Sequence, residues 1–232
     1  MSLRKTLPEF SYRNVSLFAL ISVLFLCSLR AENLEKQKPL IVSVNDSAKF
    51  KSVQQAVDAL PQDGGIIKIL PGTYREVVTI DKPYLRIEGN SADPSKVVIV
   101  FNNSHGTVGG TLKSATVSVF GDDFFAEGIT FANDFSVGKP LAPEGAQAVA
   151  LMVKGDRAIF RNVRMRGAQD TLYTGSKSCA TDEGPCVPAR QYFSDCYIEG
   201  NVDFIFGDAQ AYFENCKIHA IPPRYNFPHG AE

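Results

Sequence analysis

Tryptophan is absent from the chain, histidine is rare, and neither sign of charge is in clear excess. The 24 lysines and arginines nearly balance the 25 aspartates and glutamates, and the basic residues form no patch of the kind that binds nucleic acid. The three histidines, His105, His219 and His229, lack the spacing of metal ligands, and the cysteines lack a paired CxxC pattern. The sequence therefore predicts no nucleic-acid partner, no metal site and no cofactor.

Long apolar runs are also scarce, and the clearest one lies near the N-terminus. Basic residues before position 14 precede an uncharged apolar run from Val15 to Leu29, and small Ser28 and Ala31 lie near its end. This pattern predicts a secretory signal over residues 1–31. A retained membrane anchor is the alternative, but the run is short for a span that needs about 20 residues. We expect a secreted protein that has no membrane contact after cleavage, with one domain over residues 32–232.

Cysteine usage fits that compartment. Cleavage would remove Cys27 and leave an even number of cysteines, which allows three disulfide pairings in an oxidising environment. It would also remove four basic residues and one acidic residue, so the formal charge would move from −1 to about −4. The remaining cysteines are Cys179, Cys186, Cys196 and Cys216.

One short amphipathic helix is predicted, from Ser52 to Leu60. Its apolar residues fall on one face, Ser52 and Gln55 are spaced as a capping box, and Pro61 ends the run. After it come short apolar or alternating stretches separated by Gly, Asn and Asp, which predict strands at 66–70, 77–80, 84–87 and 97–101 and continue to the end of the chain.

A weak internal repeat indicates how these strands are arranged. The segments 126–131, 160–165, 193–198 and 213–218 each read apolar, polar, turn-former, apolar, polar, apolar. Their turn-forming residues tolerate left-handed backbone, so each unit can turn a corner before its next strand. The fourth positions are 34, 33 and 20 residues apart by subtraction. The turn-forming residues are Gly128, Asn162, Asp195 and Asn215.

A step of about 20 residues with occasional inserted loops is typical of a parallel β-helix, in which strands stack about 4.8 Å apart. In that geometry Cys196 and Cys216 lie on neighbouring coils, so we favour a disulfide between them and a second one closing a loop between Cys179 and Cys186. An ordinary β-sandwich is the alternative, but tight hairpin dipeptides between the strands are missing.

Two aspartates in apolar surroundings are the candidate chemical groups. Asp170 lies in Gly-Ala-Gln-Asp-Thr-Leu-Tyr (167–173), and Asp203 lies in Gly-Asn-Val-Asp-Phe-Ile-Phe-Gly (200–207). Burying a lone carboxylate is unfavourable without a partner, and two carboxylates with amide donors such as Gln147 nearby suggest acid and nucleophile chemistry on an ester. Structural roles remain the alternatives. Asp170 could cap a turn through Thr171, Asp203 could accept backbone amides at a coil corner, and Gln147 could belong to a side-chain ladder.

Four motifs resemble those of the pectin methylesterase family, the carbohydrate esterases that demethylate homogalacturonan in plant cell walls. They lie within a similarity that runs from about residue 40 to about residue 220, and they occur in the family's order. The motifs are Gly-Thr-Tyr-Arg-Glu (72–76), Gln-Ala-Val-Ala-Leu (147–151), Gln-Asp-Thr-Leu-Tyr (169–173) and Asp-Phe-Ile-Phe-Gly (203–207). The resemblance implies an all-β, right-handed parallel β-helix, here with the short N-terminal helix as a cap.

The resemblance also implies roles for individual residues. Asp203 corresponds to the nucleophile that forms an acyl-enzyme, and Asp170 corresponds to the general acid that then acts as general base. Gln147 and Gln169 correspond to the donors to the tetrahedral oxyanion, each contributing about 3 kcal/mol. The matched groove aromatics are Tyr173 and Phe206, whereas Tyr74 and Glu76 are read as structural. The implied enzyme is a cofactor-free monomer of the cell wall that acts on methyl-esterified homogalacturonan and can bind a proteinaceous inhibitor.

The chain also departs from the family pattern. The family carries a downstream Leu-Gly-Arg-Pro-Trp motif whose arginine pairs with the nucleophile, and this sequence ends at Glu232 before reaching it. We therefore expect C-terminal truncation, incomplete final coils and reduced methanol release, with no inhibitor-like pro-region. Two alternatives follow. A non-catalytic polysaccharide binder would keep the groove without turnover, whereas a polysaccharide lyase would need a calcium-binding carboxylate cluster and a basic proton abstractor, which the sequence lacks.

Overall fold

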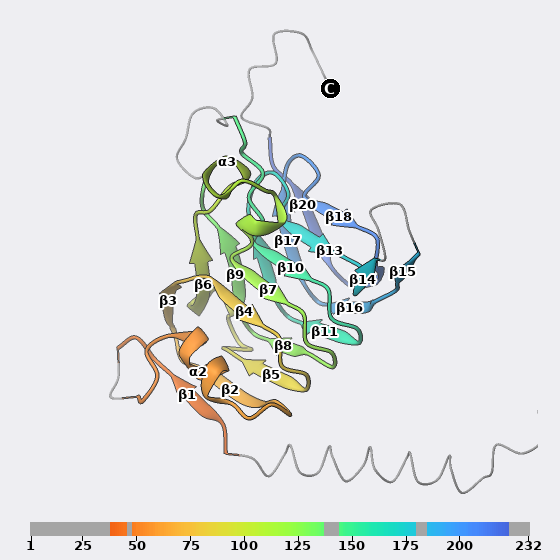
Figure 1. Ribbon diagram of the computed structural model, residues 1–232. Coiled ribbons are helices and arrows are strands. Elements are labelled where there is room, and N and C mark those ends of the chain that lie inside the picture. Colours follow the sequence, from red (N-terminus) through yellow and green to blue (C-terminus); the bar gives the residue numbers. More distant parts are fainter. Residues whose placement is uncertain (1–37, 46–47, 137–143, 180–184, 223–232) are drawn as a thin grey trace, which may run out of the picture. The chain divides into compact units, whose positions relative to one another are not determined.

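The computed structural model describes residues 38–45, 48–136, 144–179 and 185–222 (Figure 1). The predicted signal segment, residues 1–31, lies outside this range. Over the part that is described, no helix is both long enough and apolar enough to cross a membrane.

Three parallel sheets carry the strands, and the chain visits them in turn. Sheet A contains β1 (Leu40–Val42), β2 (Gly65–Ile69), β5 (Leu85–Glu88), β8 (Phe125–Glu127), β11 (Ala158–Arg161), β16 (Arg190–Ser194) and β19 (Gln210–Glu214). Sheet B contains β3 (Gly72–Arg75), β6 (Val97–Phe101), β9 (Thr130–Asn133), β12 (Arg164–Arg166), β17 (Tyr197–Gly200) and β20 (Lys217–Ala220). Sheet C contains β4 (Val78–Ile80), β7 (Val117–Val119), β10 (Leu151–Val153), β13 (Leu172–Thr174) and β18 (Ile205–Gly207).

Each full coil therefore consists of one strand from each sheet, and successive coils stack along one axis (Figure 1). In the described residues, β1 precedes the first full coil, and β19 and β20 follow the last one. The predicted strands near 66–70, 77–80, 84–87 and 97–101 correspond to β2, β4, β5 and β6. All neighbouring strands within the three sheets are parallel, whereas β14 (Ser178–Cys179) and β15 (Cys186–Val187) form a small antiparallel pair. The parallel β-helix is confirmed, and the β-sandwich alternative is wrong.

The repeat marks the corner between sheets A and B. Its four turn-forming residues all have left-handed backbone, with φ of 66° at Gly128, 51° at Asn162, 55° at Asp195 and 52° at Asn215. The residues that align in the sequence repeat are also partners in neighbouring strands, as in the register of Phe160 with Phe193 in sheet A. The predicted corners and register are therefore confirmed.

The core runs along the axis inside the coils, and aromatic rings line part of it. Phe160 and Phe193 stack with ring centroids 4.9 Å apart and an interplanar angle of 8°, and Phe193 and Phe213 stack at 4.8 Å and 9°. Because strand register brings the same repeat position above itself in each coil, one aromatic position yields a continuous stack.

The predicted helix is α2 (Val53–Ala59), which covers the first coil at its open end. Ser52 caps it, accepting a hydrogen bond from Gln55 N at 3.4 Å. The carboxylate of Glu76 binds the same helix end, accepting from Ser52 Oγ at 2.6 Å and from Val53 N at 2.8 Å. Tyr74 Oη donates to the carbonyl oxygen of Leu70 at 2.7 Å. These contacts agree with the prediction that Tyr74 and Glu76 have structural roles.

The cysteine prediction is correct for one pair and wrong for the other. Cys179 and Cys186 form the predicted disulfide. Cys196 and Cys216 lie on neighbouring coils as predicted, but both are free thiols. Each thiol also contacts a backbone carbonyl: Cys196 Sγ donates to Ser194 O at 3.3 Å, and Cys216 Sγ donates to Phe193 O at 3.4 Å.

Candidate active site

The two candidate aspartates lie just before neighbouring strands of sheet C. β13 pairs with β18 in the register of Leu172 with Ile205, and counting two residues back from each places Asp170 beside Asp203. A hydrogen bond from Asp170 N to Val202 O at 3.0 Å holds this alignment. Residues 33 positions apart in the sequence are therefore neighbours on successive coils.

Both aspartates adopt a left-handed backbone, with φ of 65° at Asp170 and 48° at Asp203. Aspartate tolerates this conformation better than most residues because its short side chain bonds locally. The chain turns sharply at each position before entering the strand. The same left-handed turn thus presents a carboxyl group on each of two stacked coils.

The surroundings of the two carboxyl groups differ. Asp170 is only 6% exposed, whereas Asp203 is an exposed residue. Burial and, to a smaller extent, the nearby charge of Asp203 together raise the pKa of Asp170 to about 6. The site therefore combines a carboxyl group that holds its proton into mildly acidic solution with one that is open to solvent.

The two glutamines lie at the same edge of sheet C, in the segments that precede β10 and β13. Gln169 directly precedes Asp170, and its carbonyl oxygen accepts a hydrogen bond from Ala148 N at 3.1 Å. Gln147 lies next to Ala148, in the segment that leads into β10 one coil earlier. Its side-chain Oε1 is buried without a hydrogen-bond partner in the described structure. Three successive coils thus carry all four predicted polar residues of the site.

A buried asparagine fixes the segment that bears Gln147. Asn133 is 4% exposed, and its Nδ2 donates to Asn103 O at 2.9 Å and to Val149 O at 3.2 Å. Val149 N in turn donates to Ser114 Oγ at 3.0 Å. This network joins β9, the long insertion between β6 and β7, and the approach to β10, so the backbone near Gln147 is held from two sides.

The insertion contains α3 (His105–Val108) and the short 3-10 helix η2 (Leu112–Ser114), and a second 3-10 helix, η1 (Pro94–Lys96), directly precedes β6. His105 N donates to Gln147 O at 2.7 Å, and Gly106 N donates to Gly145 O at 2.9 Å. A Cβ atom at Gly145 would lie 2.7 Å from Gly106 Cα, so this approach requires glycine. The start of α3 therefore rests directly on the Gln147 segment.

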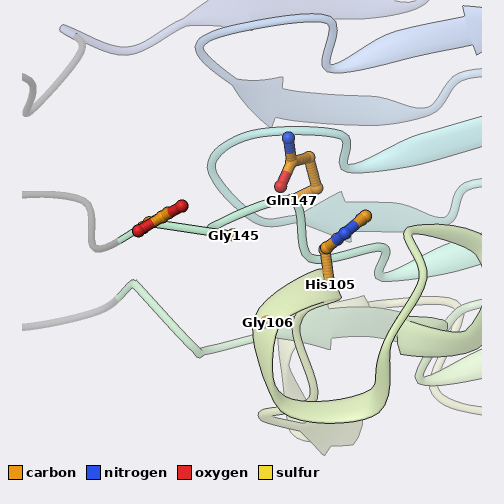
Figure 2. Close-up of a pocket in the computed structure, with 5 residues that line it drawn as sticks. His105, Gly106, Gly145 and Gln147 are labelled. Carbon is orange, nitrogen blue, oxygen red and sulfur yellow. The ribbon is translucent and has the colours of Figure 1, made fainter.

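An open hollow of about 540 Å³ lies where these segments meet (Figure 2). His105, Gly106, Glu144, Gly145 and Gln147 line it. Sequence reasoning missed His105 and Glu144, because neither belongs to a motif and only the folded insertion brings α3 against residues 144–147. The hollow adjoins the predicted catalytic edge through Gln147.

The two predicted groove aromatics are neighbours on the outer side of sheet C. Tyr173 and Phe206 are partners in the β13–β18 register, and their ring centroids lie 5.0 Å apart at 55°. They pack with Val149 and Met152 in a small apolar cluster that is separate from the axial core. Burial raises the pKa of Tyr173, with a smaller contribution from the charge of Asp208. Each aromatic residue thus follows its aspartate by three positions in the chain.

A cation or a metal ion beside a carboxylate would favour its ionised form. Within the described ranges, neither Asp170 nor Asp203 forms an ion pair with a lysine or an arginine. The one cluster of possible metal ligands in the same ranges is Cys179, Cys186 and Asp208, but its two cysteines form the disulfide. A disulfide sulfur is a poor metal ligand because it lacks the thiolate charge.

This arrangement suits chemistry at a carbonyl group. A solvent-open carboxylate can attack, a carboxyl group that keeps its proton can donate it, and side-chain amides can stabilise a developing oxyanion. The unequal environments of Asp170 and Asp203 are what separates the first two roles.

Known proteins of one family are similar to this chain both in sequence and in structure. A sequence profile described as Pectinesterase matches residues 39–227. Pectinesterase QRT1 from Arabidopsis thaliana is 38% identical over 200 residues, which cover 82% of this chain and 49% of that protein. Pectin methylesterase from carrot is similar in structure, with a TM-score of 0.69 and 33% identity over 80% of this chain and 54% of the carrot chain. A crystal structure of pectin methylesterase in complex with hexasaccharide VII matches with a TM-score of 0.67 and 34% identity over 79% of this chain and 55% of that one. The chain spans about half the length of these relatives.

Proposed function

Because the chain belongs to the pectinesterase family, we propose that it is a secreted esterase that hydrolyses methyl esters of homogalacturonan to pectate and methanol. The observation that carries the proposal is the pairing of Asp170 and Asp203 on neighbouring coils in unequal surroundings. Family membership supplies the substrate class, and the pair supplies the two chemical roles.

In the first half of the proposed reaction, a carboxylate oxygen of Asp203 attacks the carbonyl carbon of the methyl ester. The carbonyl oxygen becomes an oxyanion, which accepts hydrogen bonds from the side-chain amides of Gln147 and Gln169. When the intermediate collapses, the C–O bond to the methoxy group breaks and Asp170 gives its proton to the departing oxygen. Methanol leaves, and an anhydride joins Asp203 to the sugar carboxyl carbon.

In the second half, Asp170 is an anion and takes a proton from water. The resulting hydroxide attacks the carboxyl carbon of the sugar, and the same amides stabilise the second oxyanion. Collapse breaks the bond to Asp203, which leaves as carboxylate, and the sugar carboxyl group is released. The raised pKa of Asp170, about 6, suits a group that must both give and take a proton in mildly acidic solution.

The proposed substrate site follows the outer side of sheet C. Tyr173 and Phe206 present ring surface next to the acids, which can stack on pyranose rings. The similar structure in complex with a hexasaccharide supports an extended oligosaccharide as the ligand. We further propose that the protein acts as a monomer in the cell wall and that a proteinaceous inhibitor can bind over the same groove.

Methanol release from methyl-esterified pectin tests this function. We expect the purified chain to release methanol, Asp203→Asn to abolish the release, and Asp170→Asn to slow it by about 10²- to 10⁴-fold through loss of acid–base catalysis. Asn keeps the size of the side chain and tolerates left-handed backbone.

Asp195→Asn is the matched control. Asp195 is also an exposed aspartate with left-handed backbone, at φ 55°, but it lies at the corner between sheets A and B. This variant should release methanol at the rate of the unsubstituted chain. Substantial release by Asp203→Asn would contradict the assigned nucleophile.

Binding without turnover is the second candidate function. The family resemblance implies an arginine beside the nucleophile, and no cation is paired with Asp203 among the residues that the structure describes. Saturable binding to pectin with no methanol release by the unsubstituted chain would favour this function over the esterase.

A further inference from the structure

Four hydrogen bonds join residues 167–172, which include Asp170, to residues 199–204, which include Asp203. Three use backbone atoms only: Asn201 N to Ala168 O at 2.9 Å, Asp170 N to Val202 O at 3.0 Å, and Leu172 N to Phe204 O at 3.0 Å. They follow the ladder of β13 and β18 back into the two loops. Backbone bonds of this kind are common to all stacked coils and do not depend on which side chains are present.

The fourth bond comes from a side chain. Thr171 Oγ1 donates to Glu199 O at 2.9 Å and also lies 3.3 Å from Ala168 O. Thr171 is fully buried, and it directly follows Asp170 in the sequence. Its hydroxyl group therefore ties the Asp170 loop to the end of β17, four residues before Asp203.

Two glycines approach this hydroxyl group so closely that neither position has room for a side chain. A Cβ atom at Gly200 would lie 2.6 Å from Thr171 Oγ1 and 2.6 Å from Ala168 O, and one at Gly167 would lie 2.7 Å from Thr171 Oγ1. Distances this short cannot be accommodated without movement of the loops. The hydroxyl thus fills a fitted gap between the coils, and its contact with Glu199 O fixes their separation at this point.

We propose that Thr171 is a positioning residue whose hydroxyl group holds the Asp170 loop and the Asp203 loop at the spacing that the reaction needs. The catalytic part of this inference rests on the proposed esterase function, whereas the structural part does not. Because Thr171 is fully buried, we place its effect on the two aspartates and not on the substrate directly.

Two substitutions separate the hydroxyl group from the shape of the side chain. Thr171→Val keeps the volume but loses the donor, and it leaves Glu199 O without its side-chain partner. Thr171→Ser keeps the donor. We expect Thr171→Val to lower kcat for methanol release by about 10- to 100-fold, because small misplacements of catalytic groups have effects of this size. KM should stay within about twofold, and Thr171→Ser should restore most of kcat.

The pH profile gives a second readout. The charge of Asp203 contributes to the raised pKa of Asp170, so a wider spacing should lower that pKa. The high-pH limb of the kcat profile should therefore move to lower pH in Thr171→Val and stay in place in Thr171→Ser. A loss of global stability alone would not move this limb.

Amide hydrogen exchange tests the structural part independently of activity. In Thr171→Val, exchange at Asp170 N and Leu172 N should accelerate by at least about tenfold, because both amides donate across the two coils. Thr130→Val is the matched control: Thr130 is 2% exposed and donates to Pro94 O at 2.8 Å, away from the site. It should leave these amides, kcat and the pH profile unchanged.

The outcomes distinguish the two proposals. If the unsubstituted chain releases methanol and Thr171→Val matches it in kcat and pH profile, the positioning role is overturned. If the unsubstituted chain releases no methanol, the esterase function fails, and the exchange rates alone decide whether the hydroxyl group holds the loops. Unchanged exchange at Asp170 and Leu172 in Thr171→Val would then overturn the positioning role as well.

Discussion

At the scale of single residues, the ionised form of Asp170 lowers the stability of the folded protein. Its carboxyl group is buried beside Asp203, and its pKa is raised from 3.8 to about 6. The folded state therefore binds a proton more tightly than the unfolded state does. The group lowers stability above pH 6, where it must ionise in the folded state, and this penalty disappears below about pH 4, where the group is protonated in both states.

Asp170→Asn should consequently stabilise the protein at high pH and not at low pH. A shift of about two pKa units corresponds to at most about 3 kcal/mol, since one unit is about 1.4 kcal/mol. We expect the free energy of unfolding, measured with urea, to rise by about 1–3 kcal/mol relative to the unsubstituted chain at pH 8. The gain should shrink toward zero at pH 3.5. A difference between the two proteins that is the same at both pH values would show that packing, not ionisation, is responsible.

At the scale of elements, helix α2 is held at both ends by side chains from the coils that it covers. The carboxylate of Glu76 binds the helix N-terminus, where backbone N–H groups lack partners. At the other end, the buried ammonium group of Lys82 donates to the carbonyl oxygens of Val57 at 2.8 Å and Leu60 at 2.6 Å. A helix of seven residues has little stability of its own, so these contacts and its buried face decide whether it forms.

Glu76→Ala should therefore destabilise the fold by about 2–3 kcal/mol, because it removes a charged acceptor that serves several donors at once. Urea unfolding followed by far-ultraviolet circular dichroism measures the loss. Glu88→Ala is the comparison variant: Glu88 pairs with Arg86 on the outer side of β5 at 2.5 Å, and surface pairs contribute about 0–1 kcal/mol. Equal losses in the two variants would mean that Glu76 is no more than a surface charge.

At the scale of the whole molecule, the coils share one core but each coil touches mainly its neighbours. Phe193 illustrates this, since it is fully buried and stacks between Phe160 one coil earlier and Phe213 one coil later. In such a solenoid, stability is approximately the sum of the coils and the interfaces between them. A cavity in one coil should therefore weaken adjacent coils more than distant ones.

Phe193→Ala should lower the free energy of unfolding by about 3–5 kcal/mol. Hydrogen exchange should accelerate most in β11, β16 and β19 and least in β2 at the far end of sheet A. Tyr212→Ala is the comparison variant. Tyr212 lies in β19 and is 64% exposed, so the loss of its ring should change stability by less than about 1 kcal/mol. Uniform acceleration along the axis after Phe193→Ala would show that the coils unfold as a single unit instead.

The sequence alone determined the architecture and the identity of the candidate site residues. Corners at Asn162 and Asp195 were predictable because a left-handed turn needs particular residue types at particular positions. The stacking of the coils followed from the repeat, since side-chain alternation sets strand register. The motifs that contain Asp170 and Asp203 were recognisable because each is contiguous in the chain.

Only the tertiary structure decided what surrounds those residues. The burial of Asp170, the contact of α3 with Gln147 and the link from Thr171 to Glu199 all join positions that no local pattern connects. The free thiols of Cys196 and Cys216 were likewise not predictable, because neighbouring positions on two coils do not by themselves decide whether a disulfide forms. Local pattern sets backbone conformation and register, whereas burial, and with it the pKa of Asp170, depends on how distant segments pack around the group.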